Sequence, residues 1–533
     1  MMDGLELVKK ARIGSVVPIY QEINYVRDPL EFFSKISNYG RKKNSLLLES
    51  ADISKKYGEL SLGTSNPCLR VSGFKEDFEI KALNALGRLF LKFIKKDLDF
   101  CDNIRYRKES ITGKLKMVRR TVNEEQILKL KTHADIIRTI AFKFKPTIKP
   151  FIPYCGLFGA IAYDFIDQFE NLPENNEDIF KDPDYELYFV DNLFLTDHKK
   201  EKTYIIANAL IMDNKKEQLY DKCMKTINEY EKALNKKLPK PKKFKKKKQT
   251  ITTDIPRKEY ENIVARMKKR ILAGDVFQVV QSRTAIADYN AEPLDIYKEL
   301  RNLNPSSYMF FINNKDGILL GASPEMYLRV QGEEEKTVEI KVMSGDKPRG
   351  IVNGKIDEEL DSRYEAELNI DERELAAHTM LIDIARNDVA KVSKPGTRVV
   401  NELFKVEKYS YVQHLVSNVR GILKDDLDAL HVYIASMNSG TLTGAPKIMA
   451  IKLMREVEKT KRGFYGGLVG YITPSGDFDS TTVTRSMRLK ENKAYSSAGA
   501  GIVYDSTAKN VFFETENKMK DCLVSIRKAG GLK

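Results

Sequence analysis

The chain has 533 residues, of which 42% are hydrophobic, so it is long enough for a large core and for more than one domain. Its longest apolar run, residues 151–163, is too short to span a bilayer, and the first residues lack the apolar core of a signal peptide, so we expect a cytoplasmic protein with no membrane segment. The net charge of +15 falls to +6 without the nine lysines of residues 236–248, so charge alone does not favour a nucleic-acid-binding protein.

The first 235 residues alternate between short β-rich runs and helical stretches. Residues 44–50, NSLLLES, and 203–212, TYIIANALIM, are predicted to be strands because they are short apolar runs rich in branched side chains. Residues 77–96, DFEIKALNALGRLFLKFIKK, have helical periodicity and predict a helix.

A lysine- and proline-rich segment follows. Residues 236–248 read KKLPKPKKFKKKK, with no acid, no arginine and one aromatic residue. This composition is typical of a solvated linker, and a nucleic-acid-binding arm is the alternative that its charge allows. We predict a linker over residues 236–250 and no nucleic-acid partner.

Beyond the linker, residues 257–284 predict an amphipathic helix that ends near Gly274 and is followed by a strand. Residues 317–330 and 336–350 are strand-like, the second turning at its Gly and Pro residues. One long helical region is expected over residues 357–394, before Pro395.

Residues 463–489 predict a hairpin whose turn is PSGD. Antiparallel strands mixed with long helices indicate an α+β protein, with antiparallel sheets flanked by helices, rather than a βαβ repeat.

The five cysteines lie far apart and form no Cys-x-x-Cys pair, which argues against a zinc or iron–sulfur site. We expect buried free thiols in a reducing cytosol. The cysteines are Cys68, Cys101, Cys155, Cys223 and Cys522. The absence of a GxxxxGK[ST] segment argues against a phosphate-binding loop of that kind.

The segment DERELAAHTMLIDIARND, residues 371–388, places Asp371, Glu374 and His378 on one helical face, at spacings of three and four. Such a face can hold a metal ion or simply face water. Ala377 and its neighbour Ala376 stand where a metal site would need another carboxylate.

Several segments of the second half join polar residues to glycine-rich backbone. In chain order they are AGDVFQVVQSR (273–283), GASPE (321–325), RND (386–388), YSYVQHLVS (409–417), GTLTGAPK (440–447), FYGGLVGY (464–471), AGAGIV (498–503) and ETENK (514–518). Together they resemble the chorismate-utilising enzymes, most closely the large subunit (component I) of anthranilate synthase. LLLESADI (46–53) and NPSSYMFF (304–311) resemble that subunit's tryptophan-feedback elements.

The resemblance implies the chorismate-utilising-enzyme fold, with an N-terminal region (15–210) that carries the feedback elements and a chorismate-binding catalytic domain (251–526). It also implies the conversion of chorismate and ammonia to anthranilate and pyruvate, the first committed step of tryptophan biosynthesis. That reaction needs an acid for the departing C4 hydroxyl, donors for two carboxylates and a divalent ion on the ring carboxylate.

The family's motifs assign roles to individual residues. His414 matches the general acid, since an imidazole titrates near neutral pH, and Glu325 is a partner for proton movement. Tyr465 and Arg485 match the positions that hold the pyruvyl carboxylate. The remaining positions of the implied site are Thr441 and Gln278 among the catalytic residues, and Gly345, Gly499, Gly501 and Lys518 among the substrate-binding ones.

Two positions select a branch of the family. Isochorismate and salicylate synthases place a lysine that activates water where this chain has Gln278, so ammonia is the better nucleophile here. Aminodeoxychorismate synthases commonly carry a lysine where this chain has Ser344, which disfavours that activity. An anthranilate synthase is therefore expected, with aminodeoxychorismate synthase as an alternative.

The family's magnesium (Mg2+) site uses two Glu-x-x-Glu pairs, and this chain departs from it. Glu374 and Glu514 remain, whereas Ala377 and Val511 replace the other two glutamates, and Asp346 stands where threonine is usual. Because Mg2+ keeps several waters, fewer carboxylates are tolerable, and Asp346 is expected to join the site. The alternatives are a weakened catalyst and a catalytically impaired subunit that still binds chorismate or tryptophan.

The resemblance also implies a regulator and a partner. Glu49, Ser50, Tyr308 and Met309 match the tryptophan site, which offers a carboxylate to the amino group and an apolar wall to the indole. No cysteine lies in a glycine-bounded nucleophile turn, so ammonia from glutamine is expected to come from a glutamine amidotransferase subunit in a hetero-oligomer.

Overall fold

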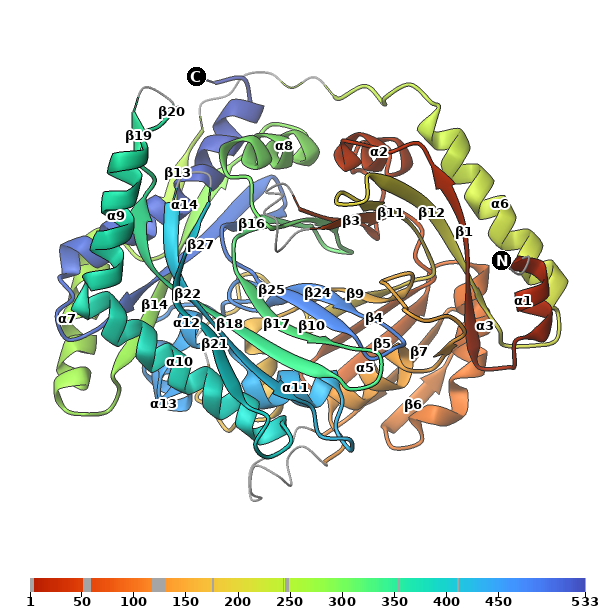
Figure 1. Cartoon of the computed structure of the whole chain (residues 1–533), viewed down its shortest axis with the longest axis horizontal. Coiled ribbons are helices and arrows are strands. Elements are labelled where there is room, and N and C mark those ends of the chain that lie inside the picture. The colour runs from red at the N-terminus through yellow and green to blue at the C-terminus, as the bar shows by residue number, and fades with distance from the viewer. Residues whose placement is uncertain are drawn as a thin grey trace.

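The computed structural model describes residues 4–50, 59–116, 130–174, 177–242, 244, 249–352, 355–409 and 412–532. In this part of the chain two large antiparallel sheets face each other, and helices cover their outer faces (Figure 1). The α+β prediction is confirmed. Within these residues no helix combines the length and the apolar composition needed to cross a membrane.

The first sheet has 13 strands and is antiparallel except for the pairing of β1 with β8. In spatial order its strands are β13 (Ile251–Thr253), β14 (Gln278–Asp288), β27 (Lys493–Ile502), β26 (Ser486–Lys490), β16 (Ile318–Ser323), β15 (Tyr308–Asn313), β2 (Ser45–Glu49), β3 (Leu60–Thr64), β11 (Asn192–Asp197), β12 (Lys202–Leu210), β1 (Ser15–Ile23) and β8 (Lys145–Pro146), with β23 (Gly444–Ala445) paired to β14.

The second sheet has 12 antiparallel strands. They are β21 (Val399–Lys408), β22 (Val412–Ile422), β18 (Thr337–Pro348), β17 (Met326–Gln331), β25 (Phe478–Thr482), β24 (Leu468–Ile472), β9 (Gly156–Ile161), β10 (Tyr185–Val190), β4 (Leu69–Phe74), β5 (Asp77–Ala82), β7 (Ser110–Lys114) and β6 (Asp102–Tyr106). A separate two-stranded ribbon pairs β19 (Ile351–Val352) with β20 (Lys355–Ile356).

Three large apolar clusters of the described residues fill the layers. The inner cluster joins side chains of both sheets, such as Leu46 of β2 and Phe158 of β9. A second cluster lies between the first sheet and the helices α1 (Gly4–Lys10), α2 (Pro29–Ile36), α6 (Lys216–Leu234), α8 (Pro293–Leu303) and α14 (Ala508–Ala529). The largest joins the second sheet to α3 (Ala85–Phe93), α5 (His133–Ala141), α7 (Arg257–Leu272), α10 (Glu372–Val392), α11 (Ala429–Ser436) and α13 (Lys447–Arg455). The remaining helices are α9 (Glu358–Ile370), the one-turn α12 (Gly440–Thr443), and the 3-10 helices η1 (Lys95–Leu98) and η2 (Tyr163–Gln168).

Most predicted elements are present, but two differ. Residues 77–82 form β5 rather than the start of a helix, because Phe78 and Ile80 alternate with exposed or half-buried residues, and the helix begins only after the Asn84 cap. The helical region 357–394 is two helices, since Asp371 has an extended backbone (ψ 99°) that ends α9 and caps α10.

The two halves of the chain share both sheets. Strand β2 pairs with β15, and β9 pairs with β24, so N-terminal and C-terminal strands are neighbours in each sheet. The described residues of 236–250 contain no helix or strand and connect α6 to β13. The division into regions 15–210 and 251–526 stays a prediction.

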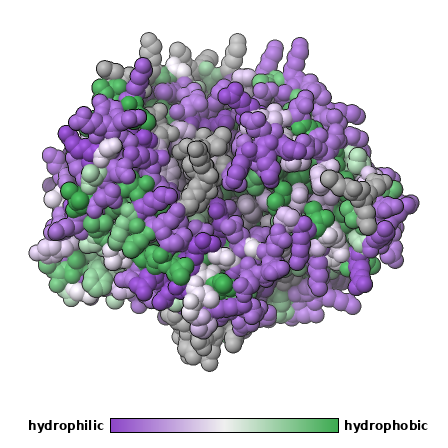
Figure 2. All heavy atoms as spheres, in the orientation of Figure 1, coloured by the Kyte–Doolittle hydropathy of each residue, from purple (hydrophilic) through white to green (hydrophobic). Residues whose placement is uncertain are grey.

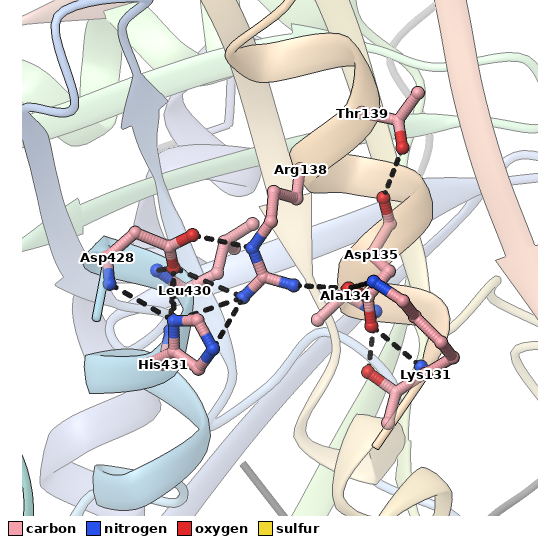
Figure 3. Close-up of polar contacts among 9 residues, drawn as sticks. Lys131, Ala134, Asp135, Arg138, Thr139, Asp428, Leu430 and His431 are labelled. Atoms are coloured by element: carbon pink, nitrogen blue, oxygen red, sulfur yellow. Dashed lines mark hydrogen bonds and ion pairs between the residues drawn. The ribbon is translucent and has the colours of Figure 1, made fainter. Parts of the chain in front are cut away.

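A charged cluster also joins the two halves (Figure 3). Arg138 on α5 donates through Nε to Asp428 Oδ2 at 2.5 Å, and its Nη1 donates to Asp135 at 2.6 Å. Asp428 caps α11, accepts from the backbone N–H of His431, and lies 2.8 Å from the His431 ring. The cluster therefore ties an N-terminal helix to the start of a C-terminal one.

Burial alone would raise the pKa of Asp428, but hydrogen bonds from His431 and Arg138 outweigh it and hold the pKa well below its usual value. A carboxylate with a depressed folded pKa contributes stability above its unfolded pKa and loses it as the pH falls. We expect Arg138→Met to lower the free energy of unfolding by about 1–3 kcal/mol at pH 7 and by less below pH ~4.

Urea unfolding at several pH values measures this. Arg88→Met is the control, because Arg88 pairs with Glu109 on an exposed surface and should cost little. A cost for Arg138→Met that stays constant between pH 7 and pH 3 would contradict the assigned role of Asp428.

Candidate functional site

A buried carboxylate lies where the loop before β17 meets α12. Glu325 accepts a hydrogen bond from Thr441 Oγ1 at 3.0 Å and one from Thr482 Oγ1 at 3.3 Å. Burial raises the pKa of Glu325 to about 7. A carboxyl group with such a pKa can exchange a proton near neutral pH, which suits general acid–base chemistry.

His414 on β22 lowers the pKa of the Glu325 carboxyl when its imidazole is charged. Its Nδ1 is 3.1 Å from the carbonyl oxygen of Gly345, at a bulge in β18. Gly345 has a φ of +67°, and a Cβ atom placed on it would lie 2.9 Å from Leu368 and 3.4 Å from Glu374 Oε2. The glycine therefore lets the strand pass between His414 and Glu374.

The glycines of β27 form a second group. Lys518 on α14 donates to the carbonyl oxygen of Gly499 at 3.0 Å and to Glu514 Oε1 at 2.7 Å. The buried Tyr465 contacts the backbone of Gly499, and a Cβ atom placed there would lie 3.2 Å from the Tyr465 hydroxyl. This group offers one ammonium, one phenol and open backbone, which are donors suited to a carboxylate.

Gln278 connects the two groups. It begins β14 and pairs with Ala445, four residues after Thr441, while its amide nitrogen lies 3.4 Å from where a Cβ atom of Gly501 would stand. Gly444 has a φ of +122°, and a Cβ atom there would lie 2.2 Å from the Gln278 carbonyl oxygen. The close approach of β23 to β14 thus requires a glycine and places a neutral amide at the centre of the site.

Arg485 stands apart from these contacts. It has a left-handed backbone (φ 48°) before β26 and lies near Asp521 of α14, whose pKa burial raises and Arg485 lowers. The structure therefore places Arg485 on the α14 side, beside another carboxylate, and its role towards the pyruvyl carboxylate stays a prediction.

The α10 face keeps Glu374 as its predicted metal ligand, whereas Asp371 and His378 have other partners. Asp371 caps the helix and accepts from the N–H groups of Arg373 and Glu374. His378 is buried between Ser344 Oγ at 2.6 Å and Ser417 Oγ at 2.9 Å, and burial lowers its pKa to about 4. The histidine is a neutral core residue that packs α10 against the second sheet.

The described donors do not fit a magnesium site by themselves. Glu514 is paired with Lys518, and Ala377 and Val511 supply no oxygen ligand. No group of three or more His, Cys, Asp or Glu side chains in the described ranges is arranged to hold a metal ion. The side chain of Asp346, predicted to be a further ligand, lies outside the described residues.

A cavity of about 1200 Å³ adjoins the site. Phe277, next to Gln278, lines it together with Ala376, Ala377 and Tyr504. Phe277 is 71% exposed and Tyr504 is 62% exposed, and Figure 2 shows hydrophobic residues at the lower left, where Figure 1 places α7, α10 and α13. The cavity gives the site room for a small molecule and an opening to solvent.

The predicted tryptophan residues lie on two faces of the first sheet. Glu49 and Met309 are cross-strand partners, and Glu49 Oε1 accepts from Tyr297 of α8 at 2.7 Å and lies 3.3 Å from Arg301 Nε. Tyr308 donates to Asp479 of the second sheet, so it points to the opposite face. Ser50 follows Glu49 and is buried.

Several polar residues of the site were not predicted. Thr482, within the strand sequence DSTT, donates to Glu325, and only the polar run at a buried hairpin signals it. Lys341, Glu407 and Tyr409 form a hydrogen-bonded group beside His414. Lys341 and Glu407 lie on strands that α9 and α10 separate in the sequence, so no local pattern points to their contact, whereas Tyr409 begins the segment YSYVQHLVS.

Comparisons with known proteins identify the family of the chain. Residues 100–524 match the family described as "chorismate binding enzyme". The chain is 37% identical over 510 residues to "Anthranilate synthase component 1" of Vibrio cholerae serotype O1, covering 95% of this chain and 96% of that protein. It is 38% identical over 507 residues to the protein of the same name from Buchnera aphidicola subsp. Pemphigus spyrothecae, covering 94% and 95%.

Solved structures agree as well. Anthranilate synthase component I from Streptococcus pneumoniae TIGR4 aligns with a TM-score of 0.69 at 28% identity, covering 87% of this chain and 92% of that chain. MenF, the menaquinone-specific isochorismate synthase of Escherichia coli, aligns with a TM-score of 0.63 over 98% and 99% of the two chains, and its 14% identity shows the fold alone.

Proposed function

Because the chain belongs to the chorismate-binding enzyme family, we propose that it is the synthase subunit of an anthranilate synthase, which converts chorismate and ammonia to anthranilate, pyruvate and water. The observation that carries the proposal is the buried Glu325, held by Thr441 and Thr482 beside His414, in a chain similar over nearly its whole length to anthranilate synthase component 1.

The proposed reaction needs two proton transfers. Ammonia adds to C2, the ring double bond shifts, and the C4–O bond breaks, so the departing oxygen must receive a proton and leave as water. Loss of the C2 proton and of pyruvate then makes the ring aromatic. His414, whose Nδ1 faces the Gly345 carbonyl, gives the first proton from Nε2 in this proposal, and Glu325, whose pKa burial raises to about 7, is the proposed partner in the proton transfers.

The neutral side chain of Gln278 favours ammonia rather than water as the nucleophile. A neutral amide does not deprotonate water, so a water-adding reaction of the isochorismate synthase type is disfavoured. Ser344 is hydrogen-bonded to His378, and no lysine stands there to support the aminodeoxychorismate synthase alternative. Tyr465, Lys518 and the Gly499 backbone are the donors for a substrate carboxylate.

Ammonia comes from a separate glutamine amidotransferase subunit in this proposal. Glutamine hydrolysis of that kind needs a reactive thiolate. All five cysteines are buried free thiols, and burial raises the pKa of each of them. The chain itself therefore offers no thiolate for glutamine hydrolysis, and a hetero-oligomer follows.

The decisive test is anthranilate formation by the purified chain. We expect fluorescence of anthranilate with chorismate, magnesium and ammonium, and none with glutamine unless an amidotransferase subunit is added. Glu325→Gln should lower kcat by about 100-fold or more, because it removes the proton exchange, whereas the exposed Glu333→Gln should not. Glutamine-dependent turnover by the chain alone would contradict the proposed need for an amidotransferase subunit. If the chain consumes no chorismate, the alternative of a catalytically impaired binding subunit is favoured.

We propose further that Mg2+ binds here through Glu374 and Glu514 with Asp346, more weakly than in a site with four glutamates. Ala377 lines the cavity, so a longer side chain has room there. Ala377→Glu should tighten Mg2+ binding by about 10-fold, measured as the MgCl2 dependence of the melting temperature. Ala376→Glu, on the same cavity, is the control, and an equal response of both variants would rule out a specific ligand position.

Tryptophan is the proposed feedback inhibitor, bound at Glu49. This carboxylate is buried, and its Oε2 has no hydrogen-bond partner among the described residues, so an ammonium group would satisfy it. Glu49→Gln should raise the tryptophan concentration for half inhibition by about 10-fold or more while ammonium-dependent activity remains.

The exposed Glu22→Gln serves as control for this experiment. Enzyme assays and thermal shifts with added tryptophan give two independent readouts. Inhibition that is equal in wild type and Glu49→Gln would place the tryptophan site elsewhere, and a wild type insensitive to tryptophan would end the feedback proposal.

A further inference from the structure

We propose that Lys341 is a positioning residue for this reaction, acting with Glu407 to fix Tyr409 against His414 and to place an ion-paired ammonium near Glu325. The inference rests on the proposed function, because it concerns the same proton-transfer groups. None of these three residues was among the expected site residues.

The contacts of Lys341 are those of a built network. Its side chain is 2% exposed and its Nζ lies 2.6 Å from Glu407 Oε2 and 3.3 Å from the Tyr409 hydroxyl. Tyr409 in turn donates to the same Glu407 oxygen at 2.9 Å. The phenol is therefore held by two charged groups and has one defined position.

The ring of Tyr409, held in this way, packs against the imidazole of His414. The two rings meet edge to face, with centroids 5.5 Å apart and an interplanar angle of 66°. Glu407 is also the cross-strand partner of His414 on β21. Together with the Gly345 carbonyl on Nδ1, these contacts restrict the imidazole from both sides and orient Nε2.

Lys341 and Thr441, the donor to Glu325, line one small cavity, and Lys341 acts on Glu325 through its charge. The charged and titratable groups around Glu325 include Lys341 on β18, His414 on β22 and Tyr327 on β17, while Thr441 and Thr482 supply neutral hydrogen bonds. Both Lys341 and His414 lower the pKa of Glu325, opposing the effect of burial. Glu407 is ion-paired with the Lys341 ammonium and therefore weakens the lowering of the Glu325 pKa by that ammonium.

Stability alone does not account for this network. Removing an ammonium and a carboxylate from water carries a large desolvation penalty, and an apolar pair of similar size is often as stable. A small apolar cluster of Met343, Tyr409 and Val416 already fills this face of the sheet. A charged pair at this place is therefore better explained by the adjacent proton-transfer groups.

The test compares variants with opposite changes in charge. Anthranilate formation is followed against pH at a fixed concentration of free ammonia in wild type, Lys341→Met, Lys341→Arg and Glu407→Gln. The limb of the kcat profile that is absent in Glu325→Gln reports the Glu325 ionisation. Lys336→Met is the matched control, because Lys336 is an ion-paired lysine next to β18 whose partner is Asp477.

We expect that limb to move up by about 0.5–1 pH unit in Lys341→Met and down by a similar amount in Glu407→Gln, which leaves the ammonium uncompensated. The kcat of Lys341→Met should fall on the order of 10-fold with little change in the KM for chorismate. Lys341→Arg, which keeps the positive charge, should have a kcat and a limb position close to those of wild type. Lys336→Met should resemble wild type.

Two outcomes overturn the inference while leaving the proposed function intact. In the first outcome the wild type is active, and the limb of the kcat profile assigned to Glu325 lies at the same pH in Lys341→Met, Glu407→Gln and wild type. The other is a shift in the same direction for both variants, which a general loosening of the site would give. If Lys341→Met does not fold, the direction of the Glu407→Gln shift decides. An inactive wild type defeats the proposed function instead.

Discussion

The burial of the Glu325 carboxylate is the constraint around which the site is built. A carboxylate excluded from water must have its oxygens satisfied, and here the hydroxyls of Thr441 and Thr482 come from two separate elements. α12 and the β24–β25 hairpin must therefore meet beside β17. The same burial makes the group sensitive to each nearby charge, so the placement of Lys341 and His414 becomes a matter of reactivity as well as of packing.

The sequence predicts the α+β class, the helix–strand unit at 257–284 and the hairpin at 463–489, because each has a clear period and an explicit turn or cap. It does not predict the break at Asp371, since one residue with an extended backbone interrupts an otherwise continuous helical pattern. Residues 77–82 are predicted as helix because the helical pattern that follows them shows no evident start. Pairing with β4 and β7 makes them a strand.

Some residues of the candidate site are named by sequence motifs, and others are found only in the folded structure. The family motifs name Glu325 with Thr441 and His414 with Gly345, and each of these pairs is in hydrogen-bond contact. Periodicity leaves the environment of His378 open, because a helical face containing acids and a histidine looks the same whether the histidine points to solvent or to two serines in the core. The contacts of Lys341 with Glu407 and Tyr409 join strands that α9 and α10 separate in the sequence, so no local sequence pattern encodes them.

The exchange of strands between the two halves has a consequence for the growing chain. Strand β9 has β24 as its neighbour, and about 300 residues separate the two. At a synthesis rate of 5–20 residues per second, the β24-facing edge of β9 stays unpaired for roughly 15–60 s after it is made. An unpaired apolar edge is a site for aggregation, so this protein should depend on ribosome-associated chaperones, and its halves should assemble when expressed as separate fragments.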